Sequence, residues 1–145
     1  MIIGSILKGK GGQVVSVGPE DTILSVARTL AEHRIGAALV RDAAGAILGI
    51  ISERDIVGGM AAHGPGTTGL KAAQFMTRDL VTVAPQTLVT QALGVMTQKR
   101  VRHLPVLDEA GTLRGLVSIG DLVKARIEEA EQEAEELKAY VTAAG

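Results

Sequence analysis

The sequence lacks cysteine and tryptophan, and Phe75 and Tyr140 are the only aromatic residues among its 145. Without cysteine there can be no disulfide framework and no thiolate metal site, which fits a reducing compartment. With so few aromatic side chains there is no platform on which successive nucleic-acid bases could stack. Because 46% of the residues are still hydrophobic, the core must be packed from Val, Ile, Leu and Ala.

The sequence also lacks an excess of charge of one sign and any long apolar run. Fifteen Lys and Arg residues against 16 Asp and Glu give a net charge of −1, too little to attract nucleic acid or anionic lipid. No apolar stretch is long enough to span a membrane, and residues 1–7 lack the features of a signal peptide. We therefore expect a soluble, cytoplasmic protein with no nucleic-acid or membrane partner.

The sequence does contain an internal repeat with two copies. Residues 14–57 recur without a gap at 80–123, so that Pro19 and Pro85 are 66 positions apart (85 − 19 = 66). The same offset joins Arg34 to Arg100, Val40 to Val106, Asp42 to Asp108, Gly45 to Gly111, Gly49 to Gly115, Ser52 to Ser118 and Asp55 to Asp121. Two copies predict a pseudo-symmetric fold with matching clefts, so ligand binding between the halves is the first functional hypothesis.

Each copy predicts the order strand, helix, strand, turn, strand, helix. The predicted elements are 14–17, 22–31, 37–40, 42–45, 46–51 and 52–62 in the first copy, and 81–83, 87–98, 104–107, 108–111, 112–117 and 118 onward in the second. A loop at 63–69 and a short helix at 70–76 join them. The fold class is therefore α/β, a small sheet with helices on one side, built twice. We assign 1–66 to the first copy, 67–125 to the second and 126–145 to a C-terminal helix.

The C-terminal segment departs from the repeat because it is dense in Glu and carries apolar residues at helical spacing. These residues are Ile127, Ala130, Ala134, Leu137 and Val141. Two interpretations stay open. The stripe either packs on its own domain or meets its mate across a dimer axis.

The motif Ser-x-x-Asp occurs at both strand-to-helix junctions, as Ser52 to Asp55 and as Ser118 to Asp121. It is first of all a capping box, in which Ser and Asp satisfy backbone N–H groups at the helix start. The same helix start can also accept a phosphate, and an Asp carboxylate can accept two hydrogen bonds from the vicinal hydroxyls of a ribose. Its recurrence favours a ligand site in at least one copy.

Cationic side chains gather before the second copy's middle strand. Arg100, Arg102 and His103 lie within four residues, a pattern typical of an anion clamp. By contrast, His33 and His63 lack partners at metal-ligand spacing, so no metal site is expected. Residues 4–11 resemble a phosphate loop but place Gly11 where Ser or Thr is required. We expect Lys8 and Lys10 instead to flank the first copy's entrance, within reach of a phosphate.

The sequence resembles a tandem of cystathionine-β-synthase (CBS) domains, a Bateman module. The resemblance is carried by the paired units, by the segments Gly49-Ile50-Ile51-Ser52-Glu53-Arg54-Asp55 and Gly115-Leu116-Val117-Ser118-Ile119-Gly120-Asp121, and by the run Arg102-His103-Leu104-Pro105-Val106. The resemblance spans about residues 1 to 125. It implies two β-α-β-β-α units packed with pseudo-two-fold symmetry, and usually a homodimer. One departure is that the first copy has Ala38-Leu39-Val40 where the second has Leu104-Pro105-Val106.

The resemblance also implies two clefts that each combine both repeats and bind an adenosine compound: AMP, ADP, ATP, NAD or S-adenosylmethionine. One cleft would use Ser118, Gly120 and Asp121 with Val15, Ile35, Gly36 and Ala37. The other would use Ser52, Arg54 and Asp55 with Val81, Val101, Arg102 and His103. We expect the Asp55 cleft to favour phosphate charge and the Asp121 cleft to be neutral and roomier.

The function that follows is a nucleotide-binding sensor that changes its conformation or its surface for an unidentified regulated protein, with no catalytic residues and no obligatory cofactor. The C-terminal helix, which follows the Ser118 junction directly, is the expected output element. Two alternatives stay open. The chain could be a nucleotide hydrolase that uses His103 with Asp55 or Asp121, or an interaction and dimerisation module with vestigial clefts.

Overall fold

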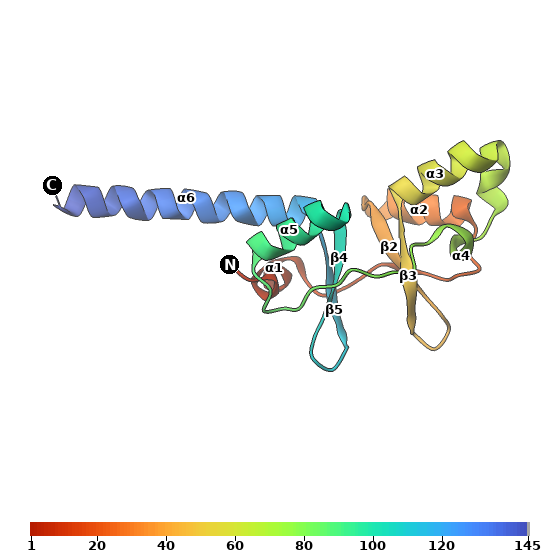
Figure 1. Cartoon of the computed structure of the whole chain (residues 1–145), viewed down its shortest axis with the longest axis horizontal. Coiled ribbons are helices and arrows are strands. Elements are labelled where there is room, and N and C mark those ends of the chain that lie inside the picture. Colours follow the sequence, from red (N-terminus) through yellow and green to blue (C-terminus); the bar gives the residue numbers. More distant parts are fainter. Residues whose placement is uncertain (145) are drawn as a thin grey trace. The chain divides into compact units, whose positions relative to one another are not determined.

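The computed structural model describes residues 1–144 and divides the chain into two compact units (Figure 1). One unit is Val14–Leu80, and the other combines Met1–Gln13 with the residues from Val81 onward. Each unit holds one copy of the repeat. The division differs from the boundaries expected from the sequence, which grouped residues 1–13 with the first copy and 67–80 with the second.

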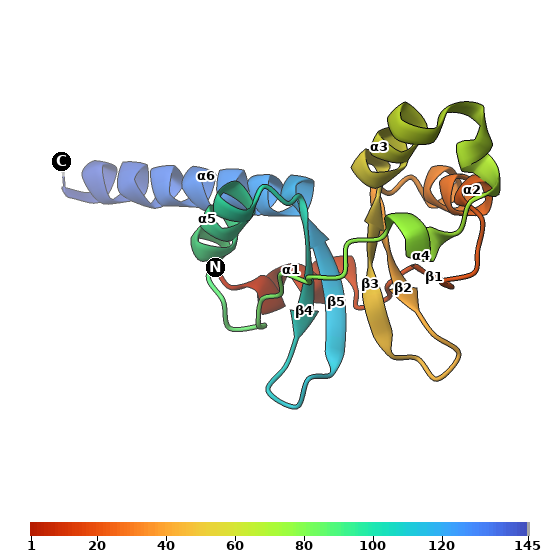
Figure 2. The same cartoon turned by 45° about the vertical axis from the view of Figure 1, so that its right-hand side comes forward.

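The first repeat forms a three-stranded sheet covered by helices (Figure 2). Strand β1 runs parallel to β2, and β2 is antiparallel to β3. The predicted loop at 63–69 is instead mostly a 3-10 helix, and the short helix that follows covers only part of 70–76. The bounds are β1 Ser16–Val17, α2 Ile23–His33, β2 Ala37–Arg41, β3 Ile47–Ser52, α3 Glu53–His63, η1 Gly64–Gly69 and α4 Ala72–Phe75.

The second repeat keeps this order, packs with the N-terminal helix α1, and extends its last helix, α6, well beyond the length of its equivalent α3. Strands β4 and β5 form an antiparallel pair whose register matches that of β2 and β3 at the offset of the repeat. Helix α1 was not predicted from the sequence. The bounds are α1 Ile3–Lys10, α5 Val89–Lys99, β4 His103–Leu107, β5 Leu113–Ser118 and α6 Ile119–Ala144.

The strand predicted at residues 81–83 is reduced to one parallel bridge between Val83 and Val106. In the first repeat the N–H of Leu39 donates to the carbonyl of Val15 at 3.2 Å and extends the pairing. The position equivalent to Leu39 is Pro105, which has no N–H to donate. The presence of Pro105 where the first repeat has Leu39 therefore shortens the first strand of the second repeat.

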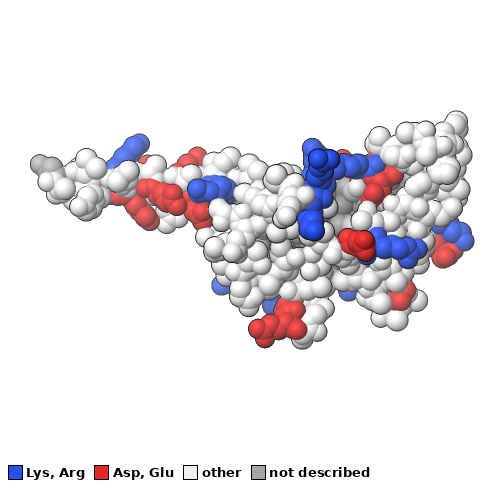
Figure 3. All heavy atoms as spheres, in the orientation of Figure 1, with Lys and Arg blue, Asp and Glu red and all other residues white. Residues whose placement is uncertain are grey.

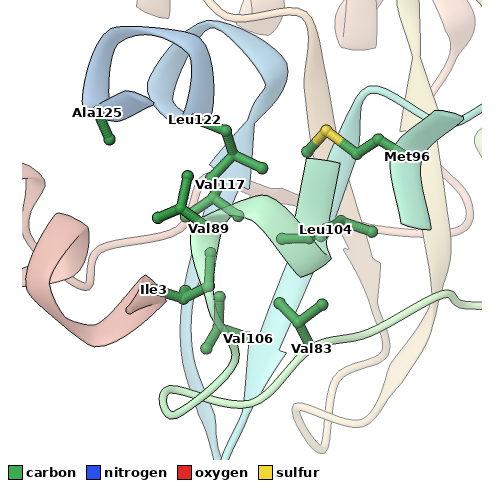
Figure 4. Close-up of a cluster of buried hydrophobic side chains, with 10 residues drawn as sticks. Ile3, Val83, Val89, Met96, Leu104, Val106, Val117, Leu122 and Ala125 are labelled. Carbon is green, nitrogen blue, oxygen red and sulfur yellow. The ribbon is translucent and has the colours of Figure 1, made fainter. Parts of the chain in front are cut away.

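Two hydrophobic cores hold the repeats, one in each unit. In the second repeat, side chains from the sheet meet side chains from α1, α5 and α6, as Figure 4 shows for Ile3, Met96, Leu104 and Leu122. The core of the first repeat is built from the equivalent strands and from α2 and α4, with Ile23, Val26, Val40, Ile51 and Met76 among its members. As expected from the composition, both cores are almost entirely aliphatic.

Helices α1 and α4 occupy equivalent places, each packed on the repeat that it does not directly precede. In the first repeat Ile23 N donates to Leu70 O (2.8 Å), and in the second Val89 N donates to Met1 O (3.0 Å). The bridge between Thr22 and Lys71 likewise corresponds to that between Leu88 and Ile2. These pairs make residue 70 the equivalent of residue 1, so the offset between the two helical segments is 69 (70 − 1 = 69) and differs from the offset of 66 between the repeats. Each repeat is thus completed by the helix that stands before the other in the sequence.

One glycine in β3 and one in β5 make room for the segment that packs on the strand: residues 76–77 after α4 on β3, and α1 on β5. A Cβ atom on Gly49 would lie 2.6 Å from the backbone carbonyl oxygen of Thr77 and 3.1 Å from Sδ of Met76. The equivalent Cβ on Gly115 would lie 2.6 Å from Cδ2 of Leu7, the end of a flexible side chain. The sequence keeps glycine at both positions, but its neighbours differ in how easily they can move.

We therefore predict that Gly49→Ala destabilises the protein by about 1–3 kcal/mol, because the backbone of Thr77, which is hydrogen-bonded to Ile50, must move. The matched variant Gly115→Ala should change the free energy of unfolding by less than about 1 kcal/mol, because Leu7 can change rotamer. Urea unfolding followed by circular dichroism measures both. Equal losses in the two variants would contradict the proposed difference.

Candidate functional site

The first candidate junction lies where β3 ends and α3 begins. Ser52 N donates to Asp55 Oδ2 at 2.9 Å, and Asp55 N donates to Ser52 Oγ at 3.3 Å. This reciprocal pair is the capping box that the sequence predicted. The carboxylate of Asp55 also accepts a long hydrogen bond, 3.4 Å, from the hydroxyl of Thr77. Asp55 is half-buried, so its carboxylate is held in place and still reaches the surface.

The second junction repeats this geometry where β5 passes into α6. Ser118 N donates to Asp121 Oδ2 at 2.8 Å, and Asp121 N donates to Ser118 Oγ at 3.2 Å. Here Lys10, at the end of α1, contributes the neighbouring cation: its Nζ lies 2.5 Å from Asp121 Oδ2 and 2.9 Å from the carbonyl oxygen of Leu116. The side chain of Asp121 is 25% exposed.

Within each unit, the start of the middle strand lies beside the capped junction of the same repeat. Glu53 N donates to Gly36 O at 2.9 Å, and Ala37 pairs with Ser52. In the second repeat Ile119 N donates to Arg102 O at 2.8 Å, and His103 pairs with Ser118. The structure thus brings Gly36 and Ala37 to Asp55, and Arg102 and His103 to Asp121. The predicted clefts combine these groups across the two units and stay predictions.

The other predicted site residues lie near the same two junctions or on the strands that lead to them. Val15 accepts the hydrogen bond from Leu39, and Ile35 directly precedes Gly36. Val81 and Val101 are partly buried against the core of the second repeat. Arg54 and Gly120 are exposed at the second position of their helices.

Thr77 and Lys10 lie against the two junctions, and sequence analysis placed neither of them there. Lys10 was expected at the first repeat's entrance, and it lies instead against Asp121 of the second repeat. The expected neutral surroundings of Asp121 therefore need correction, because an ammonium group touches its carboxylate. The offset of 69 between α4 and α1 gives no sequence signal, because no residue of 70–79 is identical to its counterpart in 1–10.

Lys10 also changes the acidity of Asp121. Burial raises the pKa of this carboxyl group, but the hydrogen bond from Lys10, the backbone hydrogen bond from Ser118 and the charge of Lys10 outweigh burial. The net pKa of Asp121 lies below its ordinary value of 3.8. Asp121 is therefore a carboxylate at neutral pH, which can accept hydrogen bonds and cannot donate a proton.

The caps limit what each junction can bind. In both helices the first N–H bonds a backbone carbonyl and the third bonds the Ser hydroxyl. A phosphate must therefore use other donors of the junction or displace the cap. Each carboxylate offers about four acceptor positions, so both retain capacity for the hydroxyl donors of a sugar. The geometry suits ribose recognition more directly than phosphate binding.

Other site chemistries find less support within residues 1–144. No group of three or more His, Asp or Glu side chains is placed to hold a metal ion. His63 packs edge-on against Phe75, with ring centroids 5.5 Å apart. No helix in this part of the chain is long and apolar enough to cross a bilayer.

Comparison with known proteins decides the family. The model of the CBS domain matches residues 11–62 and 72–128, one match for each repeat. The chain belongs to the CBS-domain family. It is 34% identical over 147 aligned residues to the mitochondrial CBS domain-containing protein CBSX3 of Arabidopsis thaliana, an alignment that covers 96% of this chain and 71% of that protein.

Solved CBS structures share the fold. A CBS-domain protein from Agrobacterium tumefaciens superposes with a TM-score of 0.84 at 41% identity, over 86% of this chain and 92% of that one. The CBS domain pair of protein MJ0100, solved with 5′-methylthioadenosine and S-adenosyl-L-methionine, superposes with a TM-score of 0.75 at 22% identity, over 86% and 98% of the two chains. At that identity the second likeness establishes the fold alone. The CBS pair and its long C-terminal helix, predicted from the sequence, are confirmed.

The contact between Lys10 and Asp121 yields a pH prediction. Lys10→Met should raise the pKa of Asp121, because it removes both the hydrogen bond and the charge that lower it. A depressed folded-state pKa stabilises the fold above the ordinary value of 3.8 and loses that contribution as the pH falls through the folded pKa. The variant should therefore lose less stability than the parent on acidification.

Carboxyl-carbon NMR titration of Asp121 measures this shift directly. Lys8→Met, on the same helix, is the control and should leave the Asp121 midpoint where it is. An unchanged midpoint in Lys10→Met would show that this ion pair does not form in solution.

Proposed function

We propose that this CBS pair is a regulatory module that binds an adenosine compound (AMP, ADP, ATP, NAD or S-adenosylmethionine) in clefts that combine both repeats. The observation that carries the proposal is the pair of capped junctions, in which Asp55 and Asp121 are held by the same hydrogen bonds and stay partly exposed. The complex of the MJ0100 domain pair with S-adenosyl-L-methionine and 5′-methylthioadenosine supports the choice of ligand class.

In this proposal each carboxylate accepts hydrogen bonds from the two ribose hydroxyls. The strand starts at Gly36 and Ala37, and at Arg102 and His103, border the base and phosphates of the ligand. The two residue sets are those that the family resemblance implies: Ser118, Gly120 and Asp121 with Val15, Ile35, Gly36 and Ala37, and Ser52, Arg54 and Asp55 with Val81, Val101, Arg102 and His103. The ligand acts as a signal, since it is bound rather than converted.

Lys10 modifies the expected difference between the clefts. Thr77 contributes a neutral hydroxyl to Asp55, whereas Lys10 contributes a cation to Asp121. Because an ammonium group attracts anions, the Asp121 cleft can also take charged ligands. The preference for phosphate in the Asp55 cleft then depends on Arg54, Arg102 and His103.

The regulated partner would respond to a change in the arrangement of the module. A ligand shifts a conformational equilibrium only by its difference in affinity for the two states, and a ligand that contacts both repeats has such a difference. Helix α6 starts at the Asp121 junction and is the proposed output element. We also propose that the module is a homodimer.

Binding can be tested with substitutions at the two junctions. Asp55→Ala and Asp121→Ala should each weaken binding of an adenosine ligand at their own cleft by about tenfold or more, because charged hydrogen bonds to ribose are lost. Isothermal titration calorimetry with AMP, ATP and S-adenosylmethionine measures affinity and stoichiometry. Asp42→Ala and Asp108→Ala remove equivalent hairpin-turn carboxylates and serve as matched controls.

The alternatives give different results in the same samples. Turnover of ATP or NAD by the purified protein would favour the hydrolase that uses His103 with Asp55 or Asp121. No heat of binding and no thermal shift with millimolar adenosine compounds would favour an interaction module with vestigial clefts, because a binder is stabilised by excess ligand. Equal losses of affinity in the hairpin-turn controls would show that the junctions are not the site.

A further inference from the structure

Helix α6 is much longer than its own unit requires. It runs from Ile119 to Ala144, 26 residues, but only Leu122 and Ala125 are buried. Figures 1 and 2 show the remaining turns extending beyond the rest of their unit. From residue 130 to 144 every side chain is exposed. A helical segment of this length is marginal in water without a partner, so an unpartnered α6 would be costly to keep.

The exposed apolar residues of α6 follow a heptad repeat. Counted from Val123, the apolar positions recur at alternating intervals of four and three residues, the spacing of a two-stranded coiled coil. In heptad notation, Ile127, Ala134 and Val141 occupy position a, and Val123, Ala130, Leu137 and Ala144 occupy position d. Ile127, Leu137 and Val141 are 52%, 64% and 61% exposed.

This stripe is separate from the face that packs on the second repeat. Leu122 and Ala125 define the inward face. At about 100° per residue, the a and d positions are centred roughly a third of a turn away from that face. The stripe is therefore accessible along its length to another helix.

Charges beside the stripe select the partner. In a parallel pair, each g position faces the e position five residues later on the other helix. Arg126 would then face Glu131 of the second copy, and Glu133 would face Lys138. Arg126 also pairs with Glu129 in its own chain, Nη1 to Oε1 at 3.2 Å, and its planar group has donors for both. The remaining Glu residues line the outer positions, and Figure 3 shows acidic side chains along the projecting turns.

An antiparallel pair fits the same charges poorly. When its apolar layers are matched, so that Ile127 meets Leu137, e positions face e positions and g positions face g positions. Glu131 then meets Glu131, and Glu133 meets Glu133. Like charges in contact destabilise a pair, so the pattern favours the parallel arrangement.

From the heptad, the exposure and the charges, we propose that residues 123–144 of two copies form a parallel two-stranded coiled coil. Two of the three a positions, Ile127 and Val141, are β-branched and one d position is Leu137, a combination that favours two strands. Ala130 and Ala134 let the helices approach closely in the middle. The proposal deepens the proposed homodimer by naming its contact surface, and it does not depend on ligand binding.

A pair of identical substitutions tests the surface in the full chain. Ala134→Glu places a charge at position a, and Ala139→Glu places the same charge at the outer position f. We expect the first to raise the dimer dissociation constant by more than about tenfold, and the second to leave it nearly unchanged. Sedimentation equilibrium measures both, and far-ultraviolet circular dichroism checks that each variant is folded.

The absence of cysteine allows a clean test of direction. Ala130→Cys and Ala134→Cys should each form a disulfide-linked dimer on mild oxidation, because equal positions face each other in a parallel pair. An antiparallel pair would cross-link at one of them at most, and Ala139→Cys is the control that should not cross-link. A monomeric parent protein would overturn both the homodimer and the coiled coil. A dimer equally insensitive to both Glu substitutions would overturn the coiled coil alone.

Discussion

The packing of each repeat against the helix that precedes the other is the constraint on which the structure depends. Helix α4 closes the core of the first repeat through Ala72, and α1 closes that of the second through Ile3. The end of α1 and the segment after α4 reach the two capped junctions, where Lys10 contacts Asp121 and Thr77 contacts Asp55. Gly49 is needed because the backbone of Thr77 passes too close for a side chain, whereas the atoms that crowd Gly115 belong to the flexible side chain of Leu7. The packing of α1 and α4 therefore both completes the two cores and brings a polar side chain to each candidate junction.

Most of the repeated architecture could be predicted because its signals are local. The capping boxes at Ser52 and Ser118 need only residues three apart, and the hairpin turns need only Asp42 or Asp108 with the following glycine. Helix α1 escaped prediction because its apolar face is short and its glycines suggested a loop. The packing of α1 on the second repeat and of α4 on the first could not be predicted from local sequence patterns, since Lys10 reaches Asp121 across more than a hundred residues of sequence. The cross-repeat clefts are similarly non-local and rest on family resemblance.

The two repeats differ where the ligand chemistry would be decided. Pro105 removes one backbone donor from the second repeat and leaves Val83 with a single bridge, whereas Leu39 keeps the pairing of β1 complete. Lys10 lowers the pKa of Asp121, and Thr77 offers Asp55 a hydroxyl. A duplicated backbone thus carries two chemically different junctions. Such asymmetry is what a sensor of two ligands, or of one ligand at two concentrations, would need.

Helix α6 joins the candidate site to the proposed dimer contact in one rigid element. Its first turn holds Asp121 through the capping box, and its later turns carry the heptad from Val123 onward. An α-helix transmits rotation along its length because every turn is tied to the next by backbone hydrogen bonds. A ligand that reoriented the Asp121 junction would turn the heptad stripe with it, and a coiled coil tolerates such rotation poorly because its knobs must stay in their holes. Ligand occupancy and the dimer contact would then be energetically coupled, and by linkage dimer formation would change ligand affinity by the same factor.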